Sequence, residues 1–192
     1  MIEIISEHSI RTDLLRSDAV ILDAGCRAFT FSNEMARRGY NVIAMDADPT
    51  VKPPSVDGVR YLSGALTSKA GVVMFKGSHD PQAGRIDPSG DQTVMSYTIK
   101  GVMDAFSVKH FGAVKLDIEG SEYEVLRNWP GPISNMISCE FHEHVCPQPA
   151  SVYDAIFEHL GKWYDCVSHE KTARHCLPPN WWDTLWVAKG CA

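Results

Sequence analysis

The chain has 192 residues, of which 44% are hydrophobic and 22% are charged, a composition that is typical of one folded domain and excludes collagen, coiled coil and intrinsic disorder. Its formal net charge of −6 argues against nucleic-acid binding, which needs a basic face to neutralise phosphates. No apolar run reaches the roughly 20 residues of a membrane-spanning helix, so we expect neither a membrane nor a nucleic acid as a partner.

The N-terminal segment and the cysteines bear on domain organisation and location. The first residues are acidic, and their apolar stretch is too short for a signal peptide. We expect residues 1–17 to form a helical extension of a single domain that covers residues 1–192. The six cysteines contain no CxxC pair and are expected to be free thiols. These features predict a cytoplasmic protein, and the sequence leaves its oligomeric state open.

Short apolar runs alternate with helix-like stretches along the chain. In chain order, strands are expected at residues 20–22, 41–45, 59–62, 71–75, 111–116, 134–141 and 184–188, and helices at 31–38, 121–128 and 152–160. The fourth of these strands is expected at an edge of the sheet. Strands that are separated by helices indicate βαβ units and a mainly parallel sheet, for which a doubly wound α/β fold is the simplest topology.

One stretch stands apart from this alternation. Residues 77–92 contain three glycines, two prolines and three aspartates, with almost nothing apolar. A structureless loop of this length is unusual in a compact domain. We expect either a lid over the site or a mobile surface loop without chemistry.

The first two expected strands end in residues that suit a nucleotide cofactor. In an open α/β sheet, ligands bind beyond the carboxyl ends of the strands, where this chain places Asp23 and Gly25, and then Asp46. Gly25 allows a tight turn close to a ligand, and the carboxylate of Asp46 can accept hydrogen bonds from both hydroxyls of a ribose. The run from residue 25 to 29 has one glycine, whereas a dinucleotide fingerprint has three. The loop therefore favours an adenosine cofactor without phosphates, such as S-adenosylmethionine, over NAD or FAD.

The segment from residue 115 to 126 is the most specific passage in the sequence. A buried central strand should be apolar on both faces, but Lys115, Asp117 and Glu119 recur with period two at the strand exit. The following strand repeats this pattern with Glu140 and His142 on one side. If the two strands are neighbours, five ionisable groups converge at the carboxyl edge of the sheet. Lys115 is expected to have a mainly structural role, in a pair with one of the carboxylates.

This segment also carries a family resemblance. Residues 114–122 match the pattern Val-Lys-(Ile/Leu)-Asp-x-Glu-Gly-x-Glu of FkbM-type S-adenosylmethionine-dependent methyltransferases. Residues 20–25 and 42–49 resemble the first motif and the acidic second-strand motif of that family, and residues 137–142 and 183–187 fit its later strands less specifically. The resemblance spans about residues 18–188. It implies a Rossmann-like class I methyltransferase: a mainly parallel seven-stranded sheet with helices on both faces and an antiparallel last strand.

The resemblance further implies S-adenosyl-L-methionine as the cofactor and O-methylation of a hydroxyl on a small-molecule or sugar-containing acceptor. The implied cofactor-binding residues are Asp23, Gly25, Cys26, Arg27, Asp46, Ala47, Ala65 and Asp117, and the implied catalytic residues are Asp117, His142 and Glu119. The chain departs from the family at three places. Phe29 replaces a usual glycine, Arg27 stands near a usual asparagine and is able to meet the cofactor carboxylate, and Asp46 replaces a frequent glutamate.

Methyl transfer to an aliphatic hydroxyl requires an aligned acceptor and removal of its proton. Our hypothesis is that His142 or Asp117 takes this proton while Glu119 orients the acceptor. Histidine is the easier base at neutral pH because its unperturbed pKa is about 6.5.

Three alternatives remain open at this point. His142 and His144 form a His-x-His pair that suggests a metal, but no second motif completes a four-ligand set, and no metal is expected. Trp181 and Trp182 are expected to pack in the core rather than to stack on an acceptor. The alternatives to a methyltransferase are a non-catalytic protein that binds an adenosine cofactor and an NAD(P)-linked oxidoreductase with a similar sheet.

Overall fold

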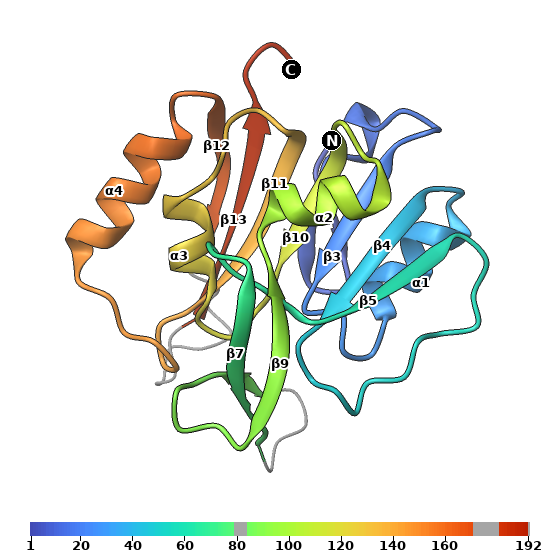
Figure 1. The fold of residues 1–192 in the computed structure, drawn as a ribbon. Helices are drawn as coiled ribbons and strands as arrows, with labels where there is room; N and C mark the ends of the chain where they lie inside the picture. The colour runs from blue at the N-terminus through green and yellow to red at the C-terminus, as the bar shows by residue number, and fades with distance from the viewer. Residues whose placement is uncertain (79–83, 171–180, 192) are drawn as a thin grey trace.

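A seven-stranded sheet forms the centre of the molecule in the computed structural model, which describes residues 1–78, 84–170 and 181–191 (Figure 1). The strand order is β12-β13-β11-β10-β3-β4-β5. The strands are β3 (Val20–Ala24), β4 (Asn41–Asp46), β5 (Val59–Ser63), β10 (Phe111–Leu116), β11 (Ser134–His142), β12 (Tyr164–Glu170) and β13 (Trp181–Ala188). All neighbouring pairs are parallel except those of β13, which runs antiparallel to β11 and to β12. The mainly parallel sheet with an antiparallel last strand is thereby confirmed.

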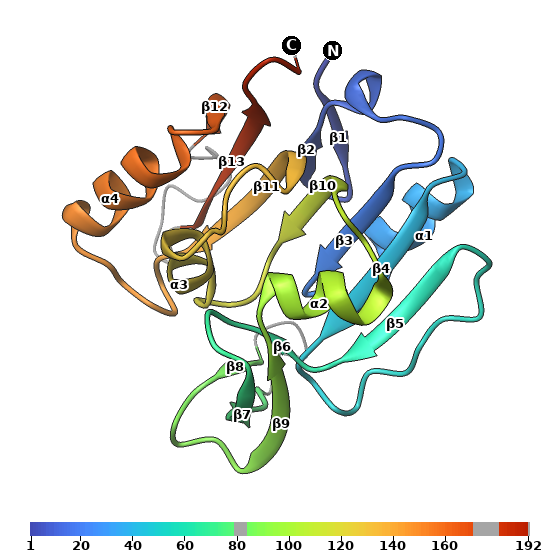
Figure 2. The same ribbon diagram turned by 45° about the horizontal axis from the view of Figure 1, so that its top comes forward.

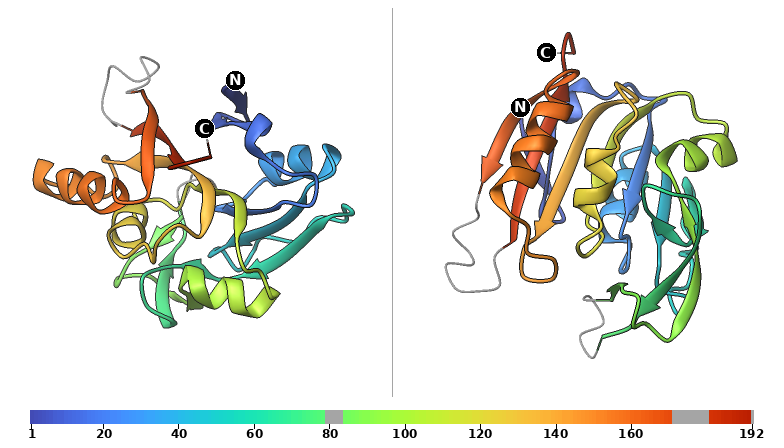
Figure 3. Two further views of the ribbon diagram at one scale, coloured as in Figure 1. Left: turned by 90° about the horizontal axis from the view of Figure 1, so that it is seen from above. Right: turned by 60° about the vertical axis from the view of Figure 1, so that its left-hand side comes forward.

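Two layers cover the faces of the central sheet. Helices α2 (Ile99–Phe106), α3 (Glu122–Arg127) and α4 (Ala150–Leu160) pack on one face, where they bury alternate residues of β3, β4, β10 and β11. Helix α1 (Thr30–Arg37) and an N-terminal β-hairpin cover the other face and bury the intervening residues. The view from above separates α2 and α3 from α1 and the hairpin on opposite sides of the sheet (Figure 3). Because both faces are covered, β3, β4 and β10 are almost continuously apolar.

The N-terminal hairpin corrects our expectation of a helical extension at residues 1–17. Strand β1 (Glu3–Ile5) pairs antiparallel with β2 (His8–Ile10), and a short 3₁₀ helix (Thr12–Leu14) follows. Ser6 and Glu7 form the two-residue turn with φ of 47° and 73°, the left-handed pair that matches the twist of a hairpin. Ile5 and Ile10 enter the core beneath this hairpin. The packing of these isoleucines against the sheet thus stabilises the hairpin, although its turn contains neither glycine nor asparagine.

A second, four-stranded sheet lies beside the carboxyl ends of the central strands (Figure 2). Its order is β6-β9-β7-β8, formed by β6 (Ala65–Leu66), β7 (Gly71–Lys76), β8 (Arg85–Ile86) and β9 (Gln92–Tyr97). The expected strand at 71–75 exists, but it lies inside this small sheet and not at an edge of the central one. The seventh central strand is instead β12, and neither it nor α2 was among the expected elements.

The small sheet also corrects part of the expectation for residues 77–92. Residues 85 and 86 pair with β7, and a turn follows in which the backbone N–H of Gly90 donates to the carbonyl of Asp87 over 2.8 Å. This half of the segment is therefore ordered structure, while residues 79–83 lie outside the described residues. Within the described part of the chain, every helix is too short or too polar to cross a membrane.

Candidate active site

A cavity of about 620 Å³ opens at the carboxyl ends of β3, β4, β10 and β11. This is the position at which open α/β sheets bind their ligands, and the volume lies in the range of small-molecule sites. The hairpin residues 6–9, and residues 84–86, which include β8, form part of its lining. The cavity lining includes every residue that the sequence predicted for the site: Asp23, Gly25, Cys26, Arg27, Asp46, Ala47, Ala65, Asp117, Glu119 and His142.

The turn after β3 forms the floor of the cavity. Gly25 has φ of +83°, and a Cβ atom at this position would lie 1.7 Å from the carbonyl oxygen of Asp117. The backbone N–H groups of Gly25 and Cys26 donate to the carbonyl of Met45 over 2.9 and 3.1 Å. The turn is therefore fixed to both neighbouring strands, and only glycine fits it.

Asp46 ends β4 and holds the same turn from the other side. Its Oδ2 accepts from the backbone N–H of Arg27, and its Oδ1 accepts from the backbone N–H of Asp48, both over 2.9 Å. Burial raises the pKa of Asp46 above its usual value. Each carboxylate oxygen can accept more than one hydrogen bond, so Asp46 keeps acceptor capacity for a ligand. The guanidinium of Arg27 forms an ion pair with Asp48.

Phe29 occupies a left-handed backbone conformation, with φ of 56°, just before α1. Its ring is buried and meets the ring of Tyr61 edge-on, at 5.6 Å between centroids. The family that the sequence resembles usually has glycine at this position, because glycine adopts a left-handed conformation without strain. Here the packing of the aromatic ring opposes the backbone strain.

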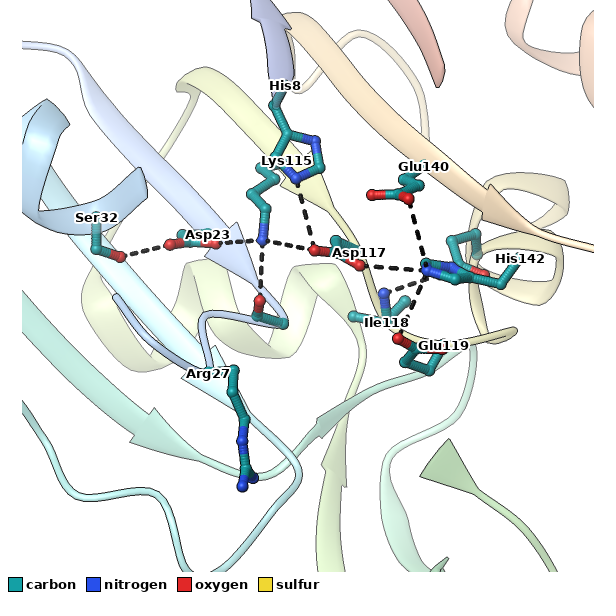
Figure 4. Close-up of polar contacts among 12 residues, drawn as sticks. His8, Asp23, Arg27, Ser32, Lys115, Asp117, Ile118, Glu119, Glu140 and His142 are labelled. Atoms are coloured by element: carbon teal, nitrogen blue, oxygen red, sulfur yellow. Dashed lines mark hydrogen bonds and ion pairs between the residues drawn. The ribbon is translucent and has the colours of Figure 1, made fainter. Parts of the chain in front are cut away.

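Lys115 links the floor of the cavity to the end of β10 (Figure 4). Its buried ammonium lies 3.0 Å from Oδ1 of Asp23 and 3.3 Å from Oδ2 of Asp117, and it donates to the carbonyl of Gly25 over 2.9 Å. Asp23 is also buried and accepts from the Ser32 hydroxyl over 2.6 Å. Although burial opposes ionisation, the Lys115 charge holds the pKa of Asp117 well below its usual range. Lys115 has the pairing partner that we expected, and Asp117 is a fixed anion.

His142 ends β11 and faces several carboxylates (Figure 4). Its Nδ1 lies 2.9 Å from Oε1 of Glu122, and its Nε2 lies 3.5 Å from Asp117, 3.6 Å from Glu119 and 4.0 Å from Glu140. Burial works against the charged imidazole, but the surrounding carboxylates, Glu122 first, raise the pKa of His142 to about 10. The carboxylates therefore favour a positive charge beside Nε2, which a proton on this nitrogen supplies when no other cation lies there. The convergence of the two strand ends is as the sequence predicted.

Two further carboxyl groups at this end of the cavity have raised pKa values. Burial, reinforced by the nearby charge of Asp117, raises the pKa of Glu140. Burial likewise raises the pKa of Asp183 on β13 to about 6. Perturbed carboxyl groups in a cleft are typical of functional sites.

Two residues of this site were missed by the sequence reasoning. His8 on β2 is 2% exposed, and its Nε2 lies 3.5 Å from Oδ2 of Asp117. Glu122 is fully buried at the start of α3, and its carboxylate accepts from the backbone N–H groups of Ile118 and Gly120, both over 2.8 Å. No local pattern marks His8, because only the docking of the hairpin brings it to Asp117. Glu122 could have been found as the last glutamate of the 114–122 motif.

The sequence also raised a metal site and three further residues, His144, Trp181 and Trp182. Among the described residues, the groups with donor atoms close enough for a metal ion are His8, Asp117 and Glu140, and Asp117, Glu119 and His142. His144 is exposed and belongs to neither group. The side chains of Trp181 and Trp182 lie outside the described residues.

Comparison with known proteins assigns the chain to a family and its structure to a known fold. The chain matches the family model described as "Methyltransferase FkbM domain" over residues 35–168, which is more than half of its length. The match contains the ends of β4, β10 and β11, and it begins after the turn at Gly25. No curated protein matches the sequence.

Several solved structures share the fold at low sequence identity. A TehB-like SAM-dependent methyltransferase from Corynebacterium glutamicum has 13% identity and a TM-score of 0.51, with 93% of this chain and 84% of that chain covered. A fibrillarin pre-rRNA processing protein from Methanococcus jannaschii has 10% identity and a TM-score of 0.56, with 91% and 68% covered. A magnesium protoporphyrin IX methyltransferase from Synechocystis, solved with bound SAM, has 11% identity and a TM-score of 0.53, with 89% and 70% covered. These similarities concern the fold, a Rossmann-like methyltransferase sheet.

Proposed function

The chain belongs to the FkbM methyltransferase domain family, and from this premise we propose that it transfers the methyl group of S-adenosyl-L-methionine to a hydroxyl oxygen of a small-molecule or sugar-containing acceptor. The observation that carries the proposal is that the Gly25 turn, the Asp46 carboxylate and the Asp117–His142 cluster line the same cavity. The first two suit the cofactor, and the cluster suits the acceptor.

The cofactor end comprises the turn after β3 and the end of β4. The Gly25 turn brings backbone close to a ligand, and Asp46 presents carboxylate oxygens that can accept from ribose hydroxyls. Cys26, Ala47 and Ala65 supply small side chains beside them. Asp23 acts indirectly, because its carboxylate is committed to Lys115 and Ser32.

Arg27 has a competing partner, since its guanidinium contacts Asp48. We therefore assign the backbone N–H of Arg27, rather than its side chain, the role of holding Asp46 in place.

The acceptor end comprises Asp117, Glu119 and His142. When bound, S-adenosylmethionine supplies an electrophilic methyl group: the acceptor oxygen forms a C–O bond, the C–S bond breaks, and the hydroxyl proton must leave. Asp117 and Glu119 would accept hydrogen bonds from acceptor hydroxyls and so orient the attacking oxygen. The hydroxyl proton would pass to His142 in its neutral form, which the surrounding carboxylates disfavour, or to Asp117, whose basicity the charge of Lys115 lowers.

A thermal-shift titration with S-adenosylhomocysteine, with NAD as the control ligand, tests the cofactor. A ligand at a hundredfold excess over its Kd stabilises the fold by about 2.7 kcal/mol. The Asp46→Ala variant should lose this shift, whereas Asp154→Ala, which removes an exposed carboxylate on α4, should keep it. A shift with NAD alone would instead support an oxidoreductase, and a shift without turnover of any acceptor would support a non-catalytic binding protein.

Transfer from labelled S-adenosylmethionine tests the acceptor class. The labelled product should be a methyl ether that survives mild alkali, whereas a methyl ester would be hydrolysed. Label on nitrogen or carbon would contradict hydroxyl methylation while leaving the cofactor assignment intact.

A further inference from the structure

We infer that the acceptor end of the cavity binds one divalent transition-metal ion, with Zn²⁺ as the best fit, through Asp117, Glu119 and His142. The binding itself follows from the side-chain geometry, and its role in catalysis rests on the proposed function. All three residues line the cavity at the exits of β10 and β11 (Figure 4).

The distances from Nε2 of His142 to the two carboxylates suit metal ligands better than hydrogen-bond partners. Nε2 of His142 lies 3.5 Å from Oδ1 of Asp117 and 3.6 Å from Oε1 of Glu119, and all three atoms lie within 4.8 Å of one another. Good N–H···O bonds span about 2.7–3.2 Å. Zinc bonds of about 2.0–2.2 Å place neighbouring tetrahedral ligands about 3.3–3.6 Å apart.

The far side of His142 has the partner that a metal-ligating histidine usually has. Nδ1 is 2.9 Å from the fully buried carboxylate of Glu122, and Glu122 is itself fixed by two backbone N–H groups of the 118–120 loop. A carboxylate on one ring nitrogen sets the tautomer and directs the lone pair of the other nitrogen to the metal. Here that other nitrogen is Nε2, which faces Asp117 and Glu119.

His8 gives a second and independent indication, from an element distant in sequence. Its imidazole is 2% exposed, its Nδ1 has no hydrogen-bond partner in the described part of the chain, and its Nε2 points at Asp117 from the opposite side, at 3.5 Å. Since 3.5 Å is long for an N–H···O bond, Nε2 of this buried imidazole is poorly satisfied in the site, which is costly. His8 forms a second donor set with Asp117 and Glu140, and this set shares Asp117 with the first one.

The charge of the cluster also favours a cation. Oδ2 of Asp117 forms an ion pair with the ammonium of Lys115, which also pairs with Asp23. On the Oδ1 side, the described residues place carboxylates and the His142 ring but no lysine or arginine within ion-pair distance of Asp117. A mixed set of imidazole and carboxylate donors suits Zn²⁺, Fe²⁺ or Mn²⁺.

A metal at this position would activate the acceptor. A hydroxyl bound to the ion loses its proton to water at a lower pH than a free one. The resulting alkoxide forms the C–O bond as the C–S bond of the cofactor breaks, and S-adenosylhomocysteine leaves with the sulfur electron pair.

Calorimetric titration of the full chain with Zn²⁺, after removal of metals with EDTA, tests the site. We expect one ion per chain, with affinity lowered at least about tenfold in Glu119→Gln and in His142→Gln, since loss of even an outer-shell partner typically weakens metal binding by that factor. Glu158→Gln, an exposed change on α4 with the same loss of charge, should bind as the wild type does. Circular dichroism of each metal-free variant establishes that it is folded.

Two outcomes would overturn the inference: no saturable binding at micromolar Zn²⁺, or equal binding by wild type and Glu119→Gln, which would place the ion on other residues. If both site variants fail to fold, Co²⁺ bound to the wild type decides the question, because nitrogen and oxygen ligands give visible absorption without the intense sulfur-to-metal charge-transfer bands of thiolates. The S-adenosylhomocysteine shift, measured on the same metal-free protein, reports on the proposed function separately.

Discussion

Gly25 and Asp117 approach each other so closely that the two strand ends they belong to form one unit. A Cβ at Gly25 would lie 1.7 Å from the carbonyl oxygen of Asp117, while the backbone N–H of Asp117 donates to the carbonyl of Ala24 over 3.1 Å. The turn that we assign to the cofactor and the residue that we assign to the acceptor are thus joined through the backbone. A displacement of one must displace the other.

We therefore expect Gly25→Ala to abolish binding of S-adenosylhomocysteine and to destabilise the fold by more than about 2 kcal/mol, because the new methyl group would overlap rigid backbone. Gly190→Ala is the matched control. Its φ of +84° is nearly the same, but nothing lies within 4 Å of the position that its new Cβ would take, so it should cost only the left-handed strain of about 1–2 kcal/mol. Urea unfolding and a thermal shift with the ligand give both quantities. Equal behaviour of the two variants would contradict the steric explanation.

Lys115 should be essential for stability because it neutralises two carboxylates. Its replacement in Lys115→Met leaves Asp23 and Asp117 without their buried cation, and removal of one partner of a buried ion pair costs about 3–5 kcal/mol. Lys189→Met removes a half-exposed lysine that lies 3.9 Å from Asp165, where an ion pair is worth about 0–1 kcal/mol. Chemical unfolding of both variants measures the difference.

The double variant Lys115→Met with Asp23→Asn separates charge from packing. If the uncompensated charge of Asp23 causes the loss, the double variant should be more stable than Lys115→Met alone. A double variant that is less stable would show that lost packing of the lysine stem dominates.

The strands of the central sheet were predictable where they are buried on both faces. The runs that form β3, β4 and β10 are almost continuously apolar, which is typical of strands buried on both faces. The hairpin was missed because Ser6 and Glu7 adopt positive φ without glycine or asparagine. Helix α2 was missed although Thr98 caps it, accepting from the N–H of Gly101 over 3.0 Å.

The site was predictable where it depends on local periodicity. Lys115, Asp117 and Glu119 follow one another with period two, and parallel pairing of β10 with β11 brings His142 to them. His8 is separated from Asp117 by more than a hundred residues, and its position depends on how the hairpin packs against the sheet. Such a contact is a property of tertiary packing and has no sequence period.

Phe29→Gly tests the balance between strain and packing before α1. Glycine would relieve the left-handed strain at φ 56°, worth about 1–2 kcal/mol, but it removes a buried ring that packs on Tyr61, a loss of about 3–5 kcal/mol for an aromatic truncation. We expect net destabilisation. Ser107→Gly relieves the same strain at φ 55° on an exposed residue and should stabilise slightly. A more stable Phe29→Gly would mean that the ring contributes little.

The thiols of Cys26 and Cys139 should resist alkylation in the folded protein. Burial raises the pKa of both thiols above the usual value, and nearby carboxylates add to the effect, so the reactive thiolate is scarce. Cys146 and Cys191 are partly exposed and should be modified first by iodoacetamide at pH 8, as peptide mass spectrometry can show. In urea all four should react, which is the control for reagent access. Because Cys26 lines the cavity, fast modification of Cys26 in the folded protein, suppressed by S-adenosylhomocysteine, would mean that the turn after β3 opens to solvent and that the ligand closes it.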